Sequence, residues 1–156
     1  MNEIEIAAAA TLSAVCLALA WNDLRRYLLP DPLTLALAVS GLLFAFLLNR
    51  DGITDHAVGL IAGFASFALI ARLYRGIRGR EGLGGGDAKL MAGAGAWVGW
   101  QGLPSTVLIG TIAALSVTLL AAKVRGHDLS AETPVPLGVF LAFGLWVTWL
   151  FGSVSF

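Results

Sequence analysis

Long apolar runs separated by short polar stretches form most of this chain of 156 residues. The runs lie at about residues 4–20, 33–48, 57–74, 88–100 and 104–122, and a last one follows residues 134–138 and ends near 151. A membrane-spanning helix needs about 20 mostly apolar residues, so several runs are short and their limits are approximate. The pattern predicts an all-α polytopic membrane protein of about six transmembrane helices, in a single domain over residues 1–156.

Composition supports a membrane protein and argues against other classes. Hydrophobic residues make up 58% of the chain and charged residues 13%, whereas about a quarter of the residues of a soluble domain are charged. The net charge is zero, so no nucleic-acid partner is expected. The single cysteine, Cys16, excludes an internal disulfide and a zinc site made of cysteines. The histidines, His56 and His127, fall on opposite sides of the predicted membrane, so neither a metal nor a cofactor is expected.

The basic residues predict the orientation of the helices. With both chain ends outside, only Arg50 of the ten basic residues falls outside, and the others lie in the inside loops. This asymmetry follows the positive-inside rule and places the loops at 25–26 and 75–80 in the cytoplasm. Basic loops on that side are expected to contact anionic lipid. Within the third run, Gly59 and Gly63 form a pair of small residues that predicts close helix packing.

Two aspartates lie at the cytoplasmic ends of predicted helices, Asp23 on the first and Asp87 on the fourth. An acidic residue at a membrane boundary is costly, which makes each a candidate functional residue. Two carboxyl groups a few Å apart cannot both ionise easily and share one proton. One can then activate a water as a base while the other polarises a peptide carbonyl as an acid. The glycines before Asp87 would let the backbone approach an extended substrate closely.

Other interpretations of these residues remain open at this point. Residues 84–86 could be a flexible loop with Asp87 as a helix N-cap, and Asp23 could be a solvated interfacial residue. The two aspartates could also form a proton or cation site in a transporter or an assembly scaffold. A transporter would be expected to show internal repeats or charges at mid-membrane, and the sequence has no clear repeat and keeps its charges near the helix ends.

Two motifs resemble those of a known family. The segment Gly84-Gly85-Gly86-Asp87-Ala88-Lys89-Leu90 is similar to the G-x-G-D-x-K-L signature of the type IV prepilin peptidases, which are membrane aspartic peptidases of pilus and type II secretion systems. Asp23, with the arginines after it and Leu29-Pro30-Asp31-Pro32, resembles the other aspartate motif of that family. The resemblance implies that Asp23 and Asp87 are the catalytic pair. It also implies that Gly84 and Gly86 shape a substrate-binding loop and that Lys89 belongs to the motif.

The resemblance further implies a substrate class and a location. Substrates would be prepilins or pseudopilins, whose short basic leader ends in glycine and precedes an apolar helix. Cleavage would take place at the cytoplasmic face of the bacterial inner membrane. Proteases that cut within a transmembrane helix use a similar G-x-G-D motif, but the surroundings of Asp23 fit them less well. The oligomeric state is not predicted.

The chain departs from the family pattern in two respects. Val139 stands where many relatives have a second proline after the glycine at position 138. Longer members also carry an N-terminal part with paired cysteines that is linked to N-methylation of the new terminus, whereas this sequence starts with its first predicted helix and has one cysteine. The expectation is a short form that cuts the leader without methylating it, or one that depends on a partner.

Overall fold

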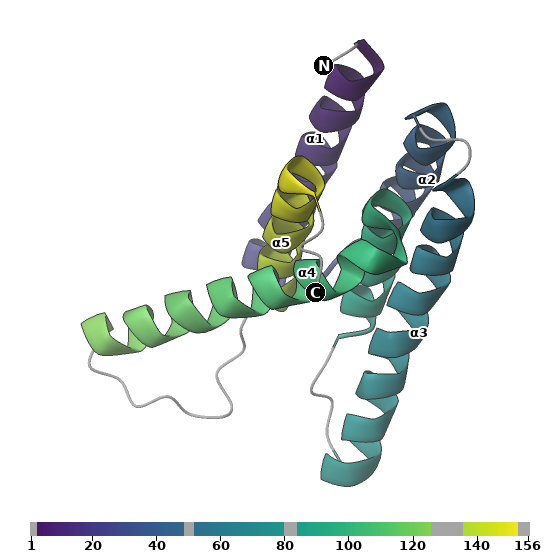
Figure 1. Ribbon diagram of the computed structural model, residues 1–156. Helices are drawn as coiled ribbons and strands as arrows, with labels where there is room; N and C mark the ends of the chain where they lie inside the picture. Colours follow the sequence, from purple (N-terminus) through teal and green to yellow (C-terminus); the bar gives the residue numbers. More distant parts are fainter. Residues whose placement is uncertain (1–2, 49–51, 80–83, 126–135, 153–156) are drawn as a thin grey trace.

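A computed structural model gives the structure of the protein and describes residues 3–48, 52–79, 84–125 and 136–152. These residues form five α-helices and no strand (Figure 1): α1 (Glu3–Arg26), α2 (Asp31–Leu48), α3 (Ile53–Arg78), α4 (Gly85–Arg125) and α5 (Leu137–Phe151). By length and composition α1 to α4 could each cross a membrane, and α5 is a shorter apolar helix. The protein is therefore an all-helical integral membrane protein, as predicted, while the count of about six spans is not confirmed.

The helix count differs from six because α4 contains both the fourth and the fifth predicted span. At 41 residues it is twice the length that one crossing needs. Gly99 breaks it, with φ 69° and ψ 177°, values that are not helical and that favour glycine. Figure 1 shows the part after the break running out to one side, at a steep angle to α1 and α5.

The first turn of α3 packs against this break. An unbroken helix would offer the carbonyl oxygen of Ala96 to the N–H of residue 100. Here Nδ1 of His56 lies 3.0 Å from that oxygen. The carboxylate of Asp55 accepts hydrogen bonds from Trp100 Nε1 at 3.2 Å and Gln101 Nε2 at 3.1 Å. These contacts hold the bend of α4 at the end of the bundle where α3 begins.

The first half of α4 lies at the centre of the bundle, where α4 packs against α2, α3 and α5. Its side chains are small or apolar and buried from residue 90 to residue 97. A side chain at Gly59 of α3 would lie 2.5 Å from the carbonyl oxygen of Gly95, and one at Gly63 would collide with the carbonyl of Met91. The predicted close packing at Gly59 and Gly63 is confirmed, and backbone meets backbone between α3 and α4.

Trp97 joins α4 to two other helices. Its indole Nε1 donates a hydrogen bond of 2.9 Å to the carbonyl oxygen of Leu37 in α2. Its ring also lies 5.5 Å from the ring of Phe44 and 5.9 Å, edge on, from that of Trp149 in α5. Because aromatic pairs at such separations are favourable, Trp97 fixes the spacing of α2, α4 and α5.

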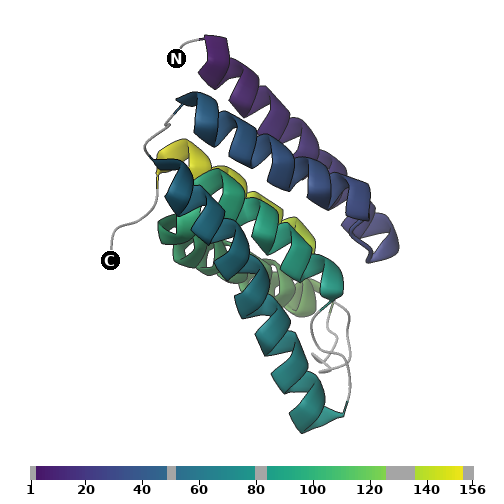
Figure 2. The same cartoon turned by 90° about the vertical axis from the view of Figure 1, so that its right-hand side faces the viewer.

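Four helix ends gather on one side of the bundle, as Figure 2 shows for the end of α1 and the starts of α2 and α4. The last turn of α1 closes at Tyr27, which has φ 51° and donates its N–H to the carbonyl of Asp23 at 2.9 Å. After a short connection, the carbonyl of Pro30 accepts the N–H groups of Leu33 and Thr34 and starts α2. This tight turn keeps α1 and α2 adjacent and places residues 27–30 beside the starts of α4 and α5.

Candidate active site

The structure brings the two predicted aspartates together. Asp23 lies in the last turns of α1 and Asp87 in the first turn of α4, and the two are close enough for their charges to repel each other. Both side chains are largely buried, with 6% of Asp23 and 9% of Asp87 exposed. Buried carboxylates are stable only with hydrogen-bond donors around them, so the neighbouring backbone decides how this pair is held.

The first turn of α5 supplies donors to Asp23. The N–H of Val139 lies 3.1 Å from Asp23 Oδ2, and the N–H of Gly138 is a second donor. The first N–H groups of a helix have no partner within the helix, and they attract an anion. The residue before α5, Pro136, provides no side-chain cap, so the carboxylate of Asp23 takes that place. A proline at position 139 would have no N–H to donate.

Asp87 is held by the turn that begins α4. Its own N–H donates to the carbonyl of Gly84 at 3.1 Å, and its carboxylate takes a hydrogen bond from the backbone of Gly84. This reciprocal arrangement is the one that a carboxylate adopts at the third position of a helix. The helix-capping interpretation of Asp87 therefore describes one of its interactions, and the same carboxyl group is close enough to Asp23 for their charges to repel each other.

Leu29 fills the space beside the two carboxyl groups, between two glycines. A side chain at Gly86 would lie 2.9 Å from Leu29 Cβ. One at Gly138 would lie 3.1 Å from Leu29 Cδ1 and 2.8 Å from Asp23 Oδ2. The sequence predicts that the glycines before Asp87 let a substrate approach the backbone, but at Gly86 that space is filled by Leu29. Gly84 is exposed, and a side chain there would make only an ordinary contact with Asp87.

Lys89 forms an ion pair that the sequence did not predict. Its Nζ lies 2.5 Å from Asp31 Oδ1, with 44% of the lysine side chain and 73% of the aspartate side chain exposed. The pair joins the first turn of α4 to the first turn of α2. It therefore helps to hold the connection that carries Leu29 against Gly86. The sequence signal for it was present, since Asp31 belongs to the motif after Asp23, but spacing alone could not pair it with Lys89.

The two histidines were predicted to lie apart. His56 is bonded at the start of α3, which is the end of the bundle away from the aspartates. His127 lies outside the described residues, so the separation of the two histidines stays a prediction.

Fold and site together define a polytopic helical membrane protein with a buried carboxylate pair where four helix ends meet. The chain belongs to the type IV leader peptidase family, whose model matches residues 10–119. This confirms the family that the two aspartate motifs indicated.

Several curated proteins are similar to the chain. The prepilin leader peptidase/N-methyltransferase of Dickeya chrysanthemi is 44% identical over 128 residues, which cover 82% of this chain and 44% of that protein. The protein of the same name from Aeromonas hydrophila is 37% identical over 146 residues, 94% of this chain and 50% of that protein. Leader peptidase HopD of Escherichia coli is 41% identical over 120 residues, 77% of each chain. The chain thus spans about half the length of the first two. No solved structure matches it.

Proposed function

We propose that this protein is a membrane-embedded aspartic endopeptidase that removes the short basic leader from prepilin or pseudopilin substrates. The observation that carries the proposal is the burial of Asp23 and Asp87 at neighbouring helix ends, close enough for their charges to repel each other. Membership of the type IV leader peptidase family supports the substrate class, as do relatives named as prepilin leader peptidases.

The reaction would use the pair as one unit sharing one proton. The unprotonated carboxyl group accepts a proton from a water molecule, whose oxygen attacks the peptide carbonyl carbon. The protonated group donates its proton to the carbonyl oxygen. When the tetrahedral intermediate collapses, the C–N bond breaks, the leaving nitrogen takes a proton from one carboxyl group, and a hydroxyl of the intermediate gives its proton to the other. The pair then holds one proton again. Neither a covalent intermediate nor a metal is required for these steps.

We propose that the pair lies at the edge of the membrane, where water can reach it. Arg25 and Arg26 lie two and three residues after Asp23 and are exposed, and we propose that this end of the bundle faces the cytoplasm of a bacterial inner membrane. Gly76, close to the same end of α3, has open space around it. A Gly76→Cys substitution in a Cys16→Ser background should react with a thiol reagent only after the membrane is opened. Labelling by an impermeant reagent in intact cells would contradict this orientation.

The mechanism is tested by Asp23→Asn and Asp87→Asn, each made alone. Asparagine keeps the shape but cannot exchange a proton, so each variant should lower cleavage of a prepilin in detergent by about 100- to 10,000-fold. The matched control is Asp55→Asn at the other end of α3, which should cleave at the wild-type rate. Either single variant retaining near-normal leader removal would refute the aspartic mechanism. Mass spectrometry of the product also detects N-methylation, which we propose these residues do not perform, because they hold only Cys16 and so lack the paired cysteines linked to that activity in longer members of the family.

A further inference from the structure

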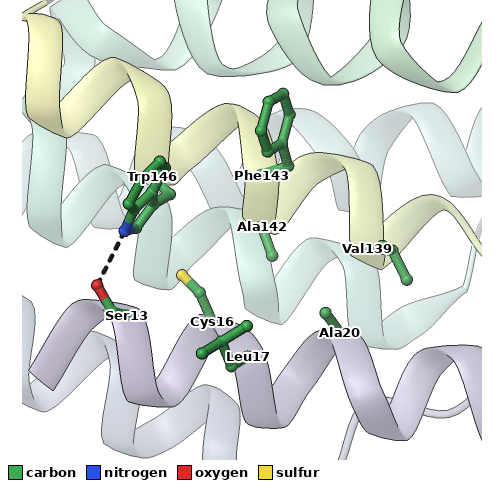
Figure 3. A pocket seen from close by; sticks show the side chains of 8 residues that line it. All are labelled: Ser13, Cys16, Leu17, Ala20, Val139, Ala142, Phe143 and Trp146. Atoms are coloured by element: carbon green, nitrogen blue, oxygen red, sulfur yellow. Dashed lines mark hydrogen bonds between the residues drawn. The ribbon is translucent and has the colours of Figure 1, made fainter. Parts of the chain in front are cut away.

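An apolar groove runs between α1 and α5, on the side of the bundle where these two helices meet (Figure 3). Its volume is about 360 Å³, within the range of pockets that bind ligands. Its lining includes Ser13, Cys16, Leu17 and Ala20 of α1, and Val139 and Trp146 of α5.

The groove offers apolar contact only. Ser13 is the most polar side chain that lines it, and its Oγ accepts a hydrogen bond of 2.9 Å from Trp146 Nε1. Figure 3 shows this bond closing one end of the groove, with the Cys16 side chain beside it. Because the polar groups satisfy one another, an occupant gains nothing from hydrogen-bonding groups. The surface therefore suits a hydrocarbon occupant.

The other end of the groove lies at the candidate catalytic carboxylate. Ala20 precedes Asp23 by three residues, which places both on neighbouring turns of α1. Val139 lines the groove, and its N–H donates to Asp23 Oδ2 at 3.1 Å. From Ser13 to Ala20 the groove follows α1 for about 10 Å, or about two helical turns. A segment that lies along the groove therefore has one end beside the aspartate pair.

We propose that this groove binds the apolar segment of the substrate that follows the scissile bond, as a helix packed between α1 and α5. The inference rests on the proposed function and names how the same site selects its substrate. A peptide at this depth must satisfy its backbone hydrogen bonds internally, so the segment in the groove is helical. It becomes extended only where it leaves the groove at Asp23. A carboxylate at the end of the groove would contribute nothing to binding a lipid chain.

A large side chain placed in the groove tests binding of the substrate helix separately from cleavage of the peptide bond. Ala20→Trp places a large ring in the groove, whereas Ala14→Trp places the same ring on an exposed face of α1 outside it. For a substrate with its complete apolar helix, Ala20→Trp should raise KM at least tenfold and Ala14→Trp should leave it unchanged. For a short peptide that holds the leader and the scissile bond but lacks the helix, both variants should cut like the wild type. Equal behaviour of the two variants on the long substrate overturns the proposal.

Crosslinking tests the groove without turnover. The protein carries Leu17→Cys with Cys16→Ser and Asp87→Asn, and the substrate has one cysteine in its apolar segment. Oxidation should join the two chains, and Ala14→Cys in place of Leu17→Cys should not. If wild-type protein cuts neither substrate but Leu17→Cys still crosslinks selectively, the groove inference stands and the peptidase proposal fails. If neither position crosslinks, or both do equally, the groove holds lipid only and the inference is wrong.

Discussion

Replacing Gly138 by alanine tests whether the start of α5 positions Asp23. The added Cβ would lie 2.8 Å from Asp23 Oδ2, whereas ordinary contacts begin at 3.4 Å, so the two groups must separate by about 0.6 Å. The hydrogen bond from Val139 to the same oxygen is 3.1 Å long. Lengthened by the same amount, it becomes about 3.7 Å and is lost.

The expected loss follows from the energy of that bond. A hydrogen bond to a charged group contributes about 1.5–3 kcal/mol. If the transition state needs Asp23 in its present position, that loss raises the barrier by the same amount. Since 1.36 kcal/mol corresponds to a factor of ten in rate, kcat/KM should fall about 10- to 100-fold. The assay is cleavage of the short leader peptide, which does not depend on the groove between α1 and α5.

The matched control is Gly76→Ala in α3, where the new Cβ meets nothing within 4 Å. Alanine in an open helical position favours the helix, so this variant should keep its kcat/KM and gain up to about 1 kcal/mol of stability. Thermal unfolding in detergent separates folding from activity. If Gly138→Ala cuts within twofold of the wild type while it remains folded, the α5 amides do not position Asp23 for catalysis.

Two further contacts give predictions of their own. Lys89→Met and Asp31→Asn should each lower kcat/KM several-fold with a stability loss of at most about 1 kcal/mol, because the pair is exposed. The exchange Lys89→Asp with Asp31→Lys should recover part of the activity, and no recovery would mean that Lys89 acts on something other than Asp31. His56→Ala should lower the free energy of unfolding by about 1 kcal/mol through loss of its bond to Ala96, with cleavage unchanged. Reduced cleavage by a folded His56→Ala protein would show that the bend in α4 is coupled to the site.

The sequence predicted the general architecture because membrane burial leaves few possibilities. Every backbone group in the hydrocarbon must be paired, so apolar runs become helices. It also placed Asp23 and Asp87 at one depth, because basic residues mark one side of the membrane. The sequence also separated the runs at residues 88–100 and 104–122, and the break at Gly99 lies close to that division. The direction that α4 takes after the break was not predictable in this way, because glycine and alanine around it are as typical of a loop as of close packing.

The sequence could not predict what holds the pair. The donors to Asp23 are backbone amides, which every residue except proline has, so no residue type marks them. In the sequence Leu29 is likewise one apolar residue among many. In the structure it leaves no room for a side chain at Gly86 or Gly138. Such roles appear only when segments far apart in the chain are placed side by side.

The position of the donors depends in turn on packing in the middle of the bundle. A side chain at Gly110 of α4 would lie 2.8 Å from the carbonyl oxygen of Phe140, and one at Gly144 would collide with the carbonyl of Thr106. Backbone therefore touches backbone along α4 and α5, and this contact fixes how α5 meets α1. The first turn of α5 reaches Asp23 only at that spacing. The carboxylate pair is thus a property of the whole helix arrangement, although the two motifs that contain it are local.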